Sequence, residues 1–113
     1  MYINTVIVGG NVLRHADYKV FSGSSVAEFT IAVNRKFKAA DGQMKEECDF
    51  IAVVAWGPLS IIARDYLRKG SACIVEGRLK QVRWESSDGK EQSKTKVYAE
   101  KIQLIGSKPQ GGL

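Results

Sequence analysis

Aromatic side chains stand beside basic side chains at several points of this sequence. The densest case is segment 35–38, Arg-Lys-Phe-Lys, and segment 80–84, Lys-Gln-Val-Arg-Trp, has the same character. Phe50 and Trp56 share one face of a predicted strand whose other face already supplies apolar residues. Aromatic rings stack on unpaired bases and cationic side chains neutralise phosphates. The pattern therefore favours a surface for single-stranded nucleic acid. The alternative is that these rings complete the core while the charges only solubilise a hairpin.

The overall composition indicates one basic domain. The chain has 113 residues, with 17 Lys and Arg against 12 Asp and Glu, a net charge of +5. The excess is concentrated in segments 35–45 and 78–101, each with a net charge of +3. A chain of this length buries about two thirds of its unfolded surface without disulfides or metals. No predicted helix is both basic and strongly apolar, so a dissolved polyanion is a better partner than a membrane.

Nothing in the sequence indicates export, and a cytoplasmic location is expected. Met1 begins a strand-like segment, with no charged n-region, no apolar h-region and no run of about 18 apolar residues. Cys48 and Cys73 each lie in an apolar strand pattern. We expect both to be buried free thiols of a reducing compartment. A disulfide or a metal pair is the alternative.

Alternating apolar residues predict an all-β chain with five strands. The predicted strands are Tyr2–Val8, Val26–Asn34, Glu47–Trp56, Ala72–Trp84 and Lys94–Ile105. We expect a bend at 9–11, and segment 11–25 is polar and ambiguous, with a turn signal at its end. Asp-Gly pairs at 41–42 and 88–89 predict hairpin loops. Gly77 predicts strong curvature in the fourth strand, as at a barrel corner.

A single helix is predicted at Pro58–Lys69. Its apolar stripe comprises Leu59, Ile62, Ala63, Tyr66 and Leu67. Pro58 suits the first helical position, and Gly70 suits a left-handed stop after the helix. Three strands, a helix and two strands is the order of the OB-fold, a five-stranded barrel with one helix between strands 3 and 4. We expect this domain to span 1–105, followed by a flexible Gly- and Pro-containing tail at 106–113.

No catalytic constellation is recognised. His15 is the sole histidine and lies in a polar turn. Glu46, Glu47 and Asp49 could suggest a nuclease-like metal site, but no second carboxylate cluster or activated nucleophile accompanies them. The simpler interpretation is that these three carboxylates are solvent-exposed residues at the start of a strand. We therefore predict no enzyme activity, no metal, no cofactor and no small-molecule substrate.

Several short motifs in sequence order resemble the bacterial-type single-stranded DNA-binding protein family. They are segments 4–11 (NTVIVGGN), 29–34 (FTIAVN), 56–57 (WG), 66–71 (YLRKGS) and 75–79 (VEGRL). The resemblance covers residues 3–104. It implies an OB-fold, sequence-tolerant binding of single-stranded DNA in replication, recombination and repair, a place at the nucleoid, and a homotetramer built as a dimer of dimers. An apolar first strand with an unpaired edge is consistent with that assembly.

The resemblance also implies site residues. Its base-stacking positions correspond to Phe37, Phe50, Trp56 and Trp84, and its groove cations to Lys19, Lys69, Lys80 and Arg83. From the basic segment itself we add Arg35, Lys36 and Lys38. The family often has Trp at the first two aromatic positions, an aromatic such as Phe at the third, and Lys at the position of Pro58. Strict alternation from Phe29 puts Phe37 on the core side, so its role requires a bulge or an exit from the barrel before it.

The C-terminal segment and two rival functions complete the expectations. Family members often continue through a linker to an acidic tip that recruits other genome-maintenance proteins. No such tip is present at 106–113, so recruitment of replication or repair proteins through it is doubtful. The rivals are OB modules that bind structured RNA, or that act as protein adaptors as the related primosomal proteins do. Stacking alone does not separate DNA from RNA.

Overall fold

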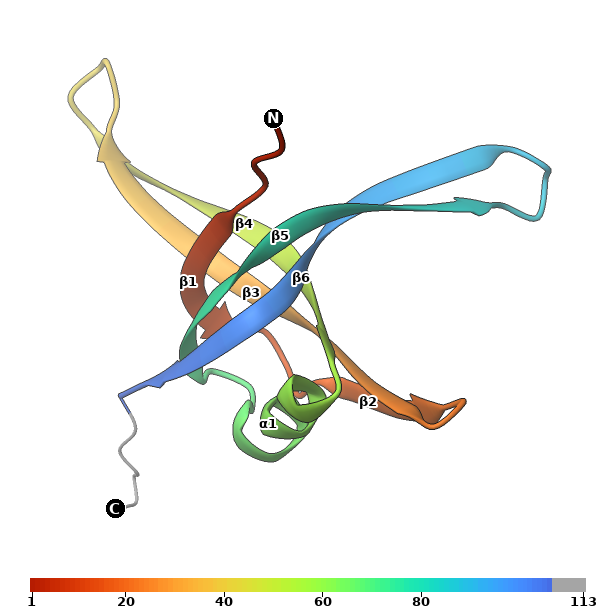
Figure 1. Ribbon diagram of the computed structural model, residues 1–113. Helices are drawn as coiled ribbons and strands as arrows, with labels where there is room; N and C mark the ends of the chain where they lie inside the picture. The colour runs from red at the N-terminus through yellow and green to blue at the C-terminus, as the bar shows by residue number, and fades with distance from the viewer. Residues whose placement is uncertain (107–113) are drawn as a thin grey trace.

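Six strands and one helix make up residues 1–106, the part of the chain that the computed structural model describes (Figure 1). The elements are β1 (Val6–Val12), β2 (Asp17–Phe21), β3 (Ser24–Lys38), β4 (Met44–Trp56), α1 (Pro58–Tyr66), β5 (Ala72–Glu85) and β6 (Glu91–Ile105). The strand order is β1-β5-β6-β4-β3-β2, and a further pairing of β1 with β3 closes the sheet into a barrel. The mostly-β chain and its single helix agree with the prediction. The tail predicted at 106–113 lies, except for Gly106, outside the described residues.

Alternate residues of the strands fill the barrel. The buried apolar residues are Val12, Ala16, Ala27, Phe29, Ile31, Val53, Val54, Ala55, Ala63, Leu67, Cys73, Val75 and Val97. All but Val54 form one cluster. The interior face was therefore identified correctly by the period-2 pattern, at Phe29 and Ile31 in one strand and at Val53 and Ala55 in the next. Burial of this one-sided apolar surface is the main force that holds the sheet closed.

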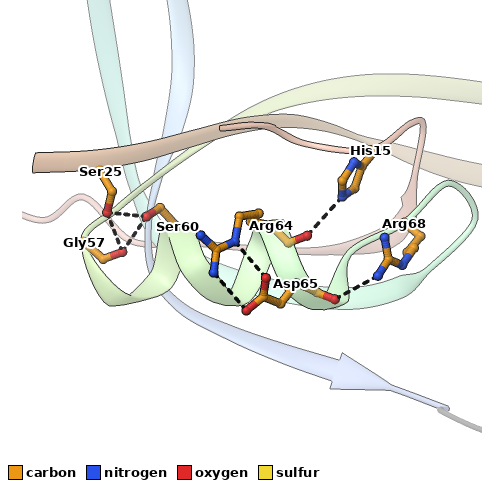
Figure 2. Close-up of polar contacts among 7 residues, drawn as sticks. All are labelled: His15, Ser25, Gly57, Ser60, Arg64, Asp65 and Arg68. Atoms are coloured by element: carbon orange, nitrogen blue, oxygen red, sulfur yellow. Dashed lines mark hydrogen bonds and ion pairs between the residues drawn. The ribbon is translucent and has the colours of Figure 1, made fainter. Parts of the chain in front are cut away.

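Helix α1 lies across one end of the barrel and is held there by polar contacts (Figure 2). The Ser60 side chain is fully buried, and its Oγ donates to the Gly57 carbonyl at 2.5 Å and lies 2.7 Å from the Ser25 Oγ. At the other end of the helix, the His15 Nε2 lies 3.0 Å from the Arg64 carbonyl oxygen. These contacts tie α1 to the start of β3 and to the loop after β1.

The helix is shorter than predicted. It ends at Tyr66, because Leu67 takes an extended conformation (φ −96°, ψ 111°) that turns its side chain into the core, where it is fully buried. Tyr66, placed by the helical period on the apolar stripe, is instead 62% exposed. Gly70 has the expected left-handed φ of 89°, in the loop that follows. Burial of Leu67 thus ends the helix three residues earlier than its sequence pattern predicted.

The N-terminal part also differs from the prediction. Strand β1 begins at Val6 rather than Tyr2 and continues through Gly9 and Gly10, where a bend was expected. Before it, the Asn4 side chain replaces a strand partner: its Nδ2 donates to the Leu79 carbonyl at 2.9 Å, and its Oδ1 accepts from the Leu79 N–H at 2.8 Å. The segment left ambiguous contains β2, which pairs with the start of β3 through the turn at Ser22-Gly23.

The two cysteines differ from each other. Cys73 is buried as predicted, and burial raises the pKa of its thiol, since the charged thiolate is disfavoured away from water. Cys48 is exposed, so its prediction as a buried thiol is wrong. It pairs with Asn34 on the same side of β4 as the exposed Phe50, opposite to the interior residues Val53 and Ala55. Both are free thiols.

The two long hairpins extend beyond the barrel as arms (Figure 1). The β3–β4 arm pairs without a register shift from Val26–Trp56 to Lys38–Met44, and the β5–β6 arm reaches Glu85–Glu91. The predicted hairpin loops are confirmed, with Gly42 and Gly89 at φ 86° and 84°. Between β4 and β6 the ladder is only two pairs long, Val53–Val97 and Val54–Tyr98, so the arms diverge from this point.

Gly77 marks the sharpest irregularity of the sheet, as predicted. The β5–β6 register shifts between Glu76 and Gly77, which leaves Glu100 as an extra residue in β6. Before the shift Val97 faces the interior, and after it Ile102 does, so β6 changes from odd to even numbering. A Cβ at position 77 would lie 2.0 Å from the Tyr98 carbonyl oxygen. The bulge therefore requires glycine on its partner strand.

We predict that Gly77→Ala lowers the free energy of unfolding by about 1–3 kcal/mol or more, because backbone of β6 must move to admit the methyl group. Gly9→Ala is the matched control, since its Cβ would meet the Ile74 Cγ1 at an ordinary 3.4 Å. We expect that control to change stability by less than about 0.5 kcal/mol. Urea unfolding followed by circular dichroism measures both, and equal losses would contradict the steric argument.

Candidate nucleic-acid interface

The side of strands β3 to β6 that faces away from the core forms one continuous surface, called here the outer face. Its membership follows from the pairing, because directly paired residues point to the same side of a sheet. Across the centre, Glu28 pairs with Val54, Val54 with Tyr98, and Tyr98 with Arg78. Its central residues are Glu28, Thr30, Ala32, Phe50, Ala52, Val54, Trp56, Arg78, Lys80, Val82, Trp84, Lys94, Lys96 and Tyr98, and the same side continues along the β3–β4 arm and onto β2.

The β3–β4 side of the outer face carries two of the predicted stacking rings. Phe50 is 61% exposed and pairs with Ala32, while Trp56 is 41% exposed at the end of β4. Lys19 lies in the same row as Trp56, because Val26 pairs with both of them. Two strand spacings, about 10 Å, separate Lys19 from Trp56. The structure thus places a predicted cation near a predicted stacking ring.

The β5–β6 arm carries the other tryptophan. Trp84 is 47% exposed, pairs with Gln92, and shares its face with Lys80 and Val82. Lys80 pairs with Lys96 across β5–β6, and the Lys96 ammonium group is held by the Glu28 carboxylate. This carboxylate offsets part of the repulsion between the two lysines, and Lys80 keeps its full charge for an anion. Arg83 points to the opposite side of the arm, where its Nη2 donates to the Gln81 Oε1 at 2.8 Å.

Phe37 on β3 points to the opposite side of the sheet from Phe50 on β4. The β3–β4 register is unbroken, so Phe37 follows Phe29, Ile31 and Val33 in the alternation. It is not in the core, because β3 has already left the barrel as part of the β3–β4 arm before this residue (Figure 1). A role for Phe37 outside the core required either a bulge or such an exit from the barrel. The ring is half-buried by its own neighbour: the Arg35 Cζ lies 4.7 Å from the ring centroid. Glu47 in turn holds Arg35 through an Nε–Oε1 contact of 3.2 Å.

The remaining predicted cations are distributed unequally. Lys36 and Lys38 are exposed on the arm and point to the outer side, opposite to Arg35. Lys69 lies in the loop between α1 and β5, and Figure 1 shows this loop beside α1, at the end of the barrel away from the two arms. The structure therefore places Lys19, Lys36, Lys38 and Lys80 on the same side of the sheet, on three different strands, and leaves Lys69 off that side.

Ion pairs reduce the charge of several cations. Arg35 pairs with Glu47, Arg78 with Glu100 at 3.9 Å, and Lys96 with Glu28. Within residues 1–106, Lys19, Lys36, Lys38 and Lys80 make no such ion pair. A cation without a carboxylate partner neutralises a phosphate more completely and so releases more of the counterions condensed on the nucleic acid. These four lysines are therefore the better candidates for phosphate contacts.

The sequence reasoning missed the basic and aromatic residues of β6. Lys94, Lys96 and Tyr98 alternate on the outer face, next to Val82, Lys80 and Arg78 of β5. The signal was present, since the alternation outward from buried Val97 places all three on one side. It was overlooked because the segment was considered only as a closing strand of the barrel.

The outer face is also hollowed beside the loop that follows β1. This hollow of about 360 Å³ is lined by Arg14, His15, Asp17, Glu28, Phe29, Thr30, Ala52 and Lys94. Its charges are mixed, with two carboxylates against two cations, which does not suit a phosphate alone. In residues 1–106 no three His, Cys, Asp or Glu side chains form a group that could hold a metal ion, and no helix there is long and apolar enough to cross a membrane.

Comparison with known proteins shows the family. A profile of the Single-strand binding protein family matches residues 3–105. Proteins named single-stranded DNA-binding protein are 40% identical in Helicobacter hepaticus (96% of this chain, 64% of that protein) and 41% identical in Wolinella succinogenes (96% and 69%). The chain belongs to the Single-strand binding protein family. It spans about two thirds of the length of these two relatives.

Solved structures show the same fold. A chain of the Plasmodium falciparum SSB complex with ssDNA superposes with a TM-score of 0.86 at 21% identity, covering 94% of this chain and 97% of that one. A deletion mutant of the single-stranded DNA binding protein from Thermus aquaticus gives a TM-score of 0.80 at 28% identity, covering 92% and 51%. The closed barrel with one helix is therefore the architecture that these proteins share.

We predict that Trp84→Ala and Trp56→Ala weaken binding to unpaired DNA by about 1–3 kcal/mol each, the contribution of one stacked base. The free energy of unfolding should fall much less than the about 3–5 kcal/mol lost when a core aromatic is truncated. Phe29→Ala supplies that reference, because Phe29 is only 4% exposed. Titration and thermal melting are measured on the same samples. Tryptophan variants that melt like Phe29→Ala yet bind normally would assign these rings to the core.

Proposed function

We propose that this protein binds single-stranded DNA without sequence preference and so protects unpaired strands in replication, recombination and repair. The observation that carries the proposal is the outer face, where exposed Phe50, Trp56 and Trp84 lie among lysines that lack carboxylate partners. Aromatic rings meet bases of any identity, and lysines track the phosphates. Membership of the Single-strand binding protein family and the names of the relatives support the same function.

The domain that performs this function is proposed to be an OB-fold over residues 1–105. In this description β2 is an addition at the start of β3, and the helix follows the third of the long predicted strands. The proposed interface residues are Phe37, Phe50, Trp56, Trp84, Lys19, Arg35, Lys36, Lys38, Lys69, Lys80 and Arg83. Of these, four lie off the outer face (Phe37, Arg35, Lys69 and Arg83), so the geometry supports them less than the other seven. The role is one of binding rather than catalysis, carried out at the nucleoid of the cytoplasm.

A homotetramer is proposed as the working form, assembled as a dimer of dimers. From Val6 to Gly10, β1 pairs with β5 on one edge only, since its pairing with β3 is confined to Asn11 and Val12. Ile7 on this strand is 65% exposed, and Ile74, which pairs with Gly9 from β5, is 38% exposed on the same face. An apolar, unpaired strand edge favours pairing with a second chain. The family resemblance supports the tetramer over a dimer.

The function is tested by titrating the fluorescence of Trp56 and Trp84 with unpaired DNA, unpaired RNA and duplex DNA. We expect tight binding and quenching with unpaired DNA of any base composition and much weaker binding to duplex, because bases must be unstacked to reach the rings. Preference for structured RNA would favour an RNA-binding OB module. Failure to bind any of the three would favour a protein adaptor.

The same titration at several salt concentrations tests the cations. For single strands, log affinity falls against log salt with a slope of about −0.7 for each neutralised phosphate. We predict that Lys80→Ala makes this slope shallower by about that amount, and that Lys36→Ala and Lys38→Ala do likewise. Arg35→Ala should change it less, because Glu47 already compensates its charge. A larger effect from Arg35 than from Lys80 would contradict this ranking.

We predict that Ile7→Glu lowers the oligomeric state, because a buried carboxylate without a partner destabilises an apolar interface. Light scattering at micromolar concentration compares it with the parent protein, for which we expect the mass of a tetramer. Ile61→Glu is the matched control: this isoleucine is 40% exposed on α1, away from β1. A stable parent monomer, or an equal effect of both variants, would refute the β1 interface.

A further inference from the structure

Tyr98 occupies the point where the two halves of the outer face join. Its Cα pairs with Arg78 across β5–β6 and with Val54 across the short β4–β6 ladder. On one side lie Phe50 and Trp56, and on the other lies the arm that ends near Trp84. A strand that passes from one group of rings to the other along this face must cross the position of Tyr98.

The distance between the predicted rings leaves room for another base-binding position. Gln92, the partner of Trp84, is six residues from Tyr98 along β6, which corresponds to about 20 Å at the usual strand rise. Trp56 is two residues beyond Val54, the β4 partner of Tyr98, which adds only about 7 Å. The four rings of the initial prediction therefore leave the centre of the outer face without an aromatic.

The Tyr98 ring is paired with a planar cation. The Arg78 Cζ lies 5.4 Å from the ring centroid, and its Nε lies 3.9 Å from the Glu100 Oε2. A guanidinium has a flat face that stacks on aromatic systems as well as a charge. Because Glu100 partly offsets the charge of Arg78, we expect the guanidinium to contribute mainly by stacking of its flat face. Lys80, the next outward residue of β5, supplies a phosphate partner nearby.

We infer that the Arg78–Tyr98 pair is a base-binding position, which receives one nucleobase of a bound single strand between the Trp84 and Trp56 positions. The inference rests on the proposed function. The simpler role for the pair is to cover Val54, which is only 6% exposed although it lies on the outer face. The two roles differ in what a flat ring contributes, because an aliphatic side chain covers Val54 but does not stack on a base.

The test uses Tyr98→Leu, which keeps an apolar cover, and Tyr98→Phe, which keeps the ring. Affinity of the full chain for fluorescein-labelled oligo(dT) is measured by anisotropy, with melting temperature measured in parallel. We expect Tyr98→Leu to bind about fivefold or more weakly, and Tyr98→Phe to bind within about twofold of the parent. A structural role predicts instead that both variants bind like the parent, in proportion to the folded fraction.

Arg78→Ala and Arg64→Ala form a second matched pair. The Arg64 Cζ lies 4.8 Å from the Tyr18 ring centroid, a similar contact on the helix side of the molecule. We expect Arg78→Ala to weaken oligo(dT) binding and Arg64→Ala to leave it unchanged. Equal effects of the two variants would overturn the inference.

Photocrosslinking locates the base directly and does not depend on how well a variant folds. Oligo(dT) carrying 5-iodouracil is irradiated in complex with the parent protein, and crosslinked peptides are mapped by mass spectrometry. A crosslink at Tyr98 supports the inference. Crosslinks at Trp56 and Trp84 without one at Tyr98, together with normal binding by Tyr98→Leu, overturn it and leave the proposed function standing. A parent that does not prefer unpaired DNA refutes both.

Discussion

Two short joins hold the barrel closed, and every surface described above depends on them. β1 meets β3 at Asn11–Ala32 and Val12–Ile31, and β4 meets β6 at Val53–Val97 and Val54–Tyr98. Ile31, Val53, Val97 and Val12 are at most 2% exposed, so the core is packed tightly at both joins. The first join also requires Gly10, whose Cβ would lie 2.3 Å from the Ala32 carbonyl oxygen. Apolar burial thus acts where the hydrogen-bonded ladders are shortest.

Because these ladders are short, the remaining length of the strands is free to extend as arms. A long hairpin that leaves the barrel exposes both of its faces, and its side chains are no longer selected for burial. This explains why Phe37, which follows the interior alternation of Phe29, Ile31 and Val33, is only half-buried. It also explains why rings from distant segments of the chain can serve one ligand.

Charge on the outer face is organised by pairing as well as by composition. A net charge of +5 draws a polyanion to the molecule, but carboxylates partly offset Arg35, Arg78 and Lys96. Lysines without such partners stand on the same strands as the guanidinium groups that lie over Phe37 and Tyr98. The arrangement divides the cations into those suited to phosphates and those suited to holding or extending aromatic surfaces.

The sequence by itself determined the β-rich class, the single helix, the hairpin loops at Gly42 and Gly89, the interior face of the strands and the basic aromatic character of the surface. These features follow from local rules: period-2 burial, turn conformation and charge.

The tertiary structure decided which face Phe37 takes, where α1 ends, that β2 exists, that Cys48 is exposed, and that Tyr98 and Arg78 meet. Each depends on contacts between residues far apart in the chain. Leu67 leaves the helix for a core built by other strands, and Glu100 bulges because of Gly77 on the neighbouring strand. A local pattern carries no information about such partners.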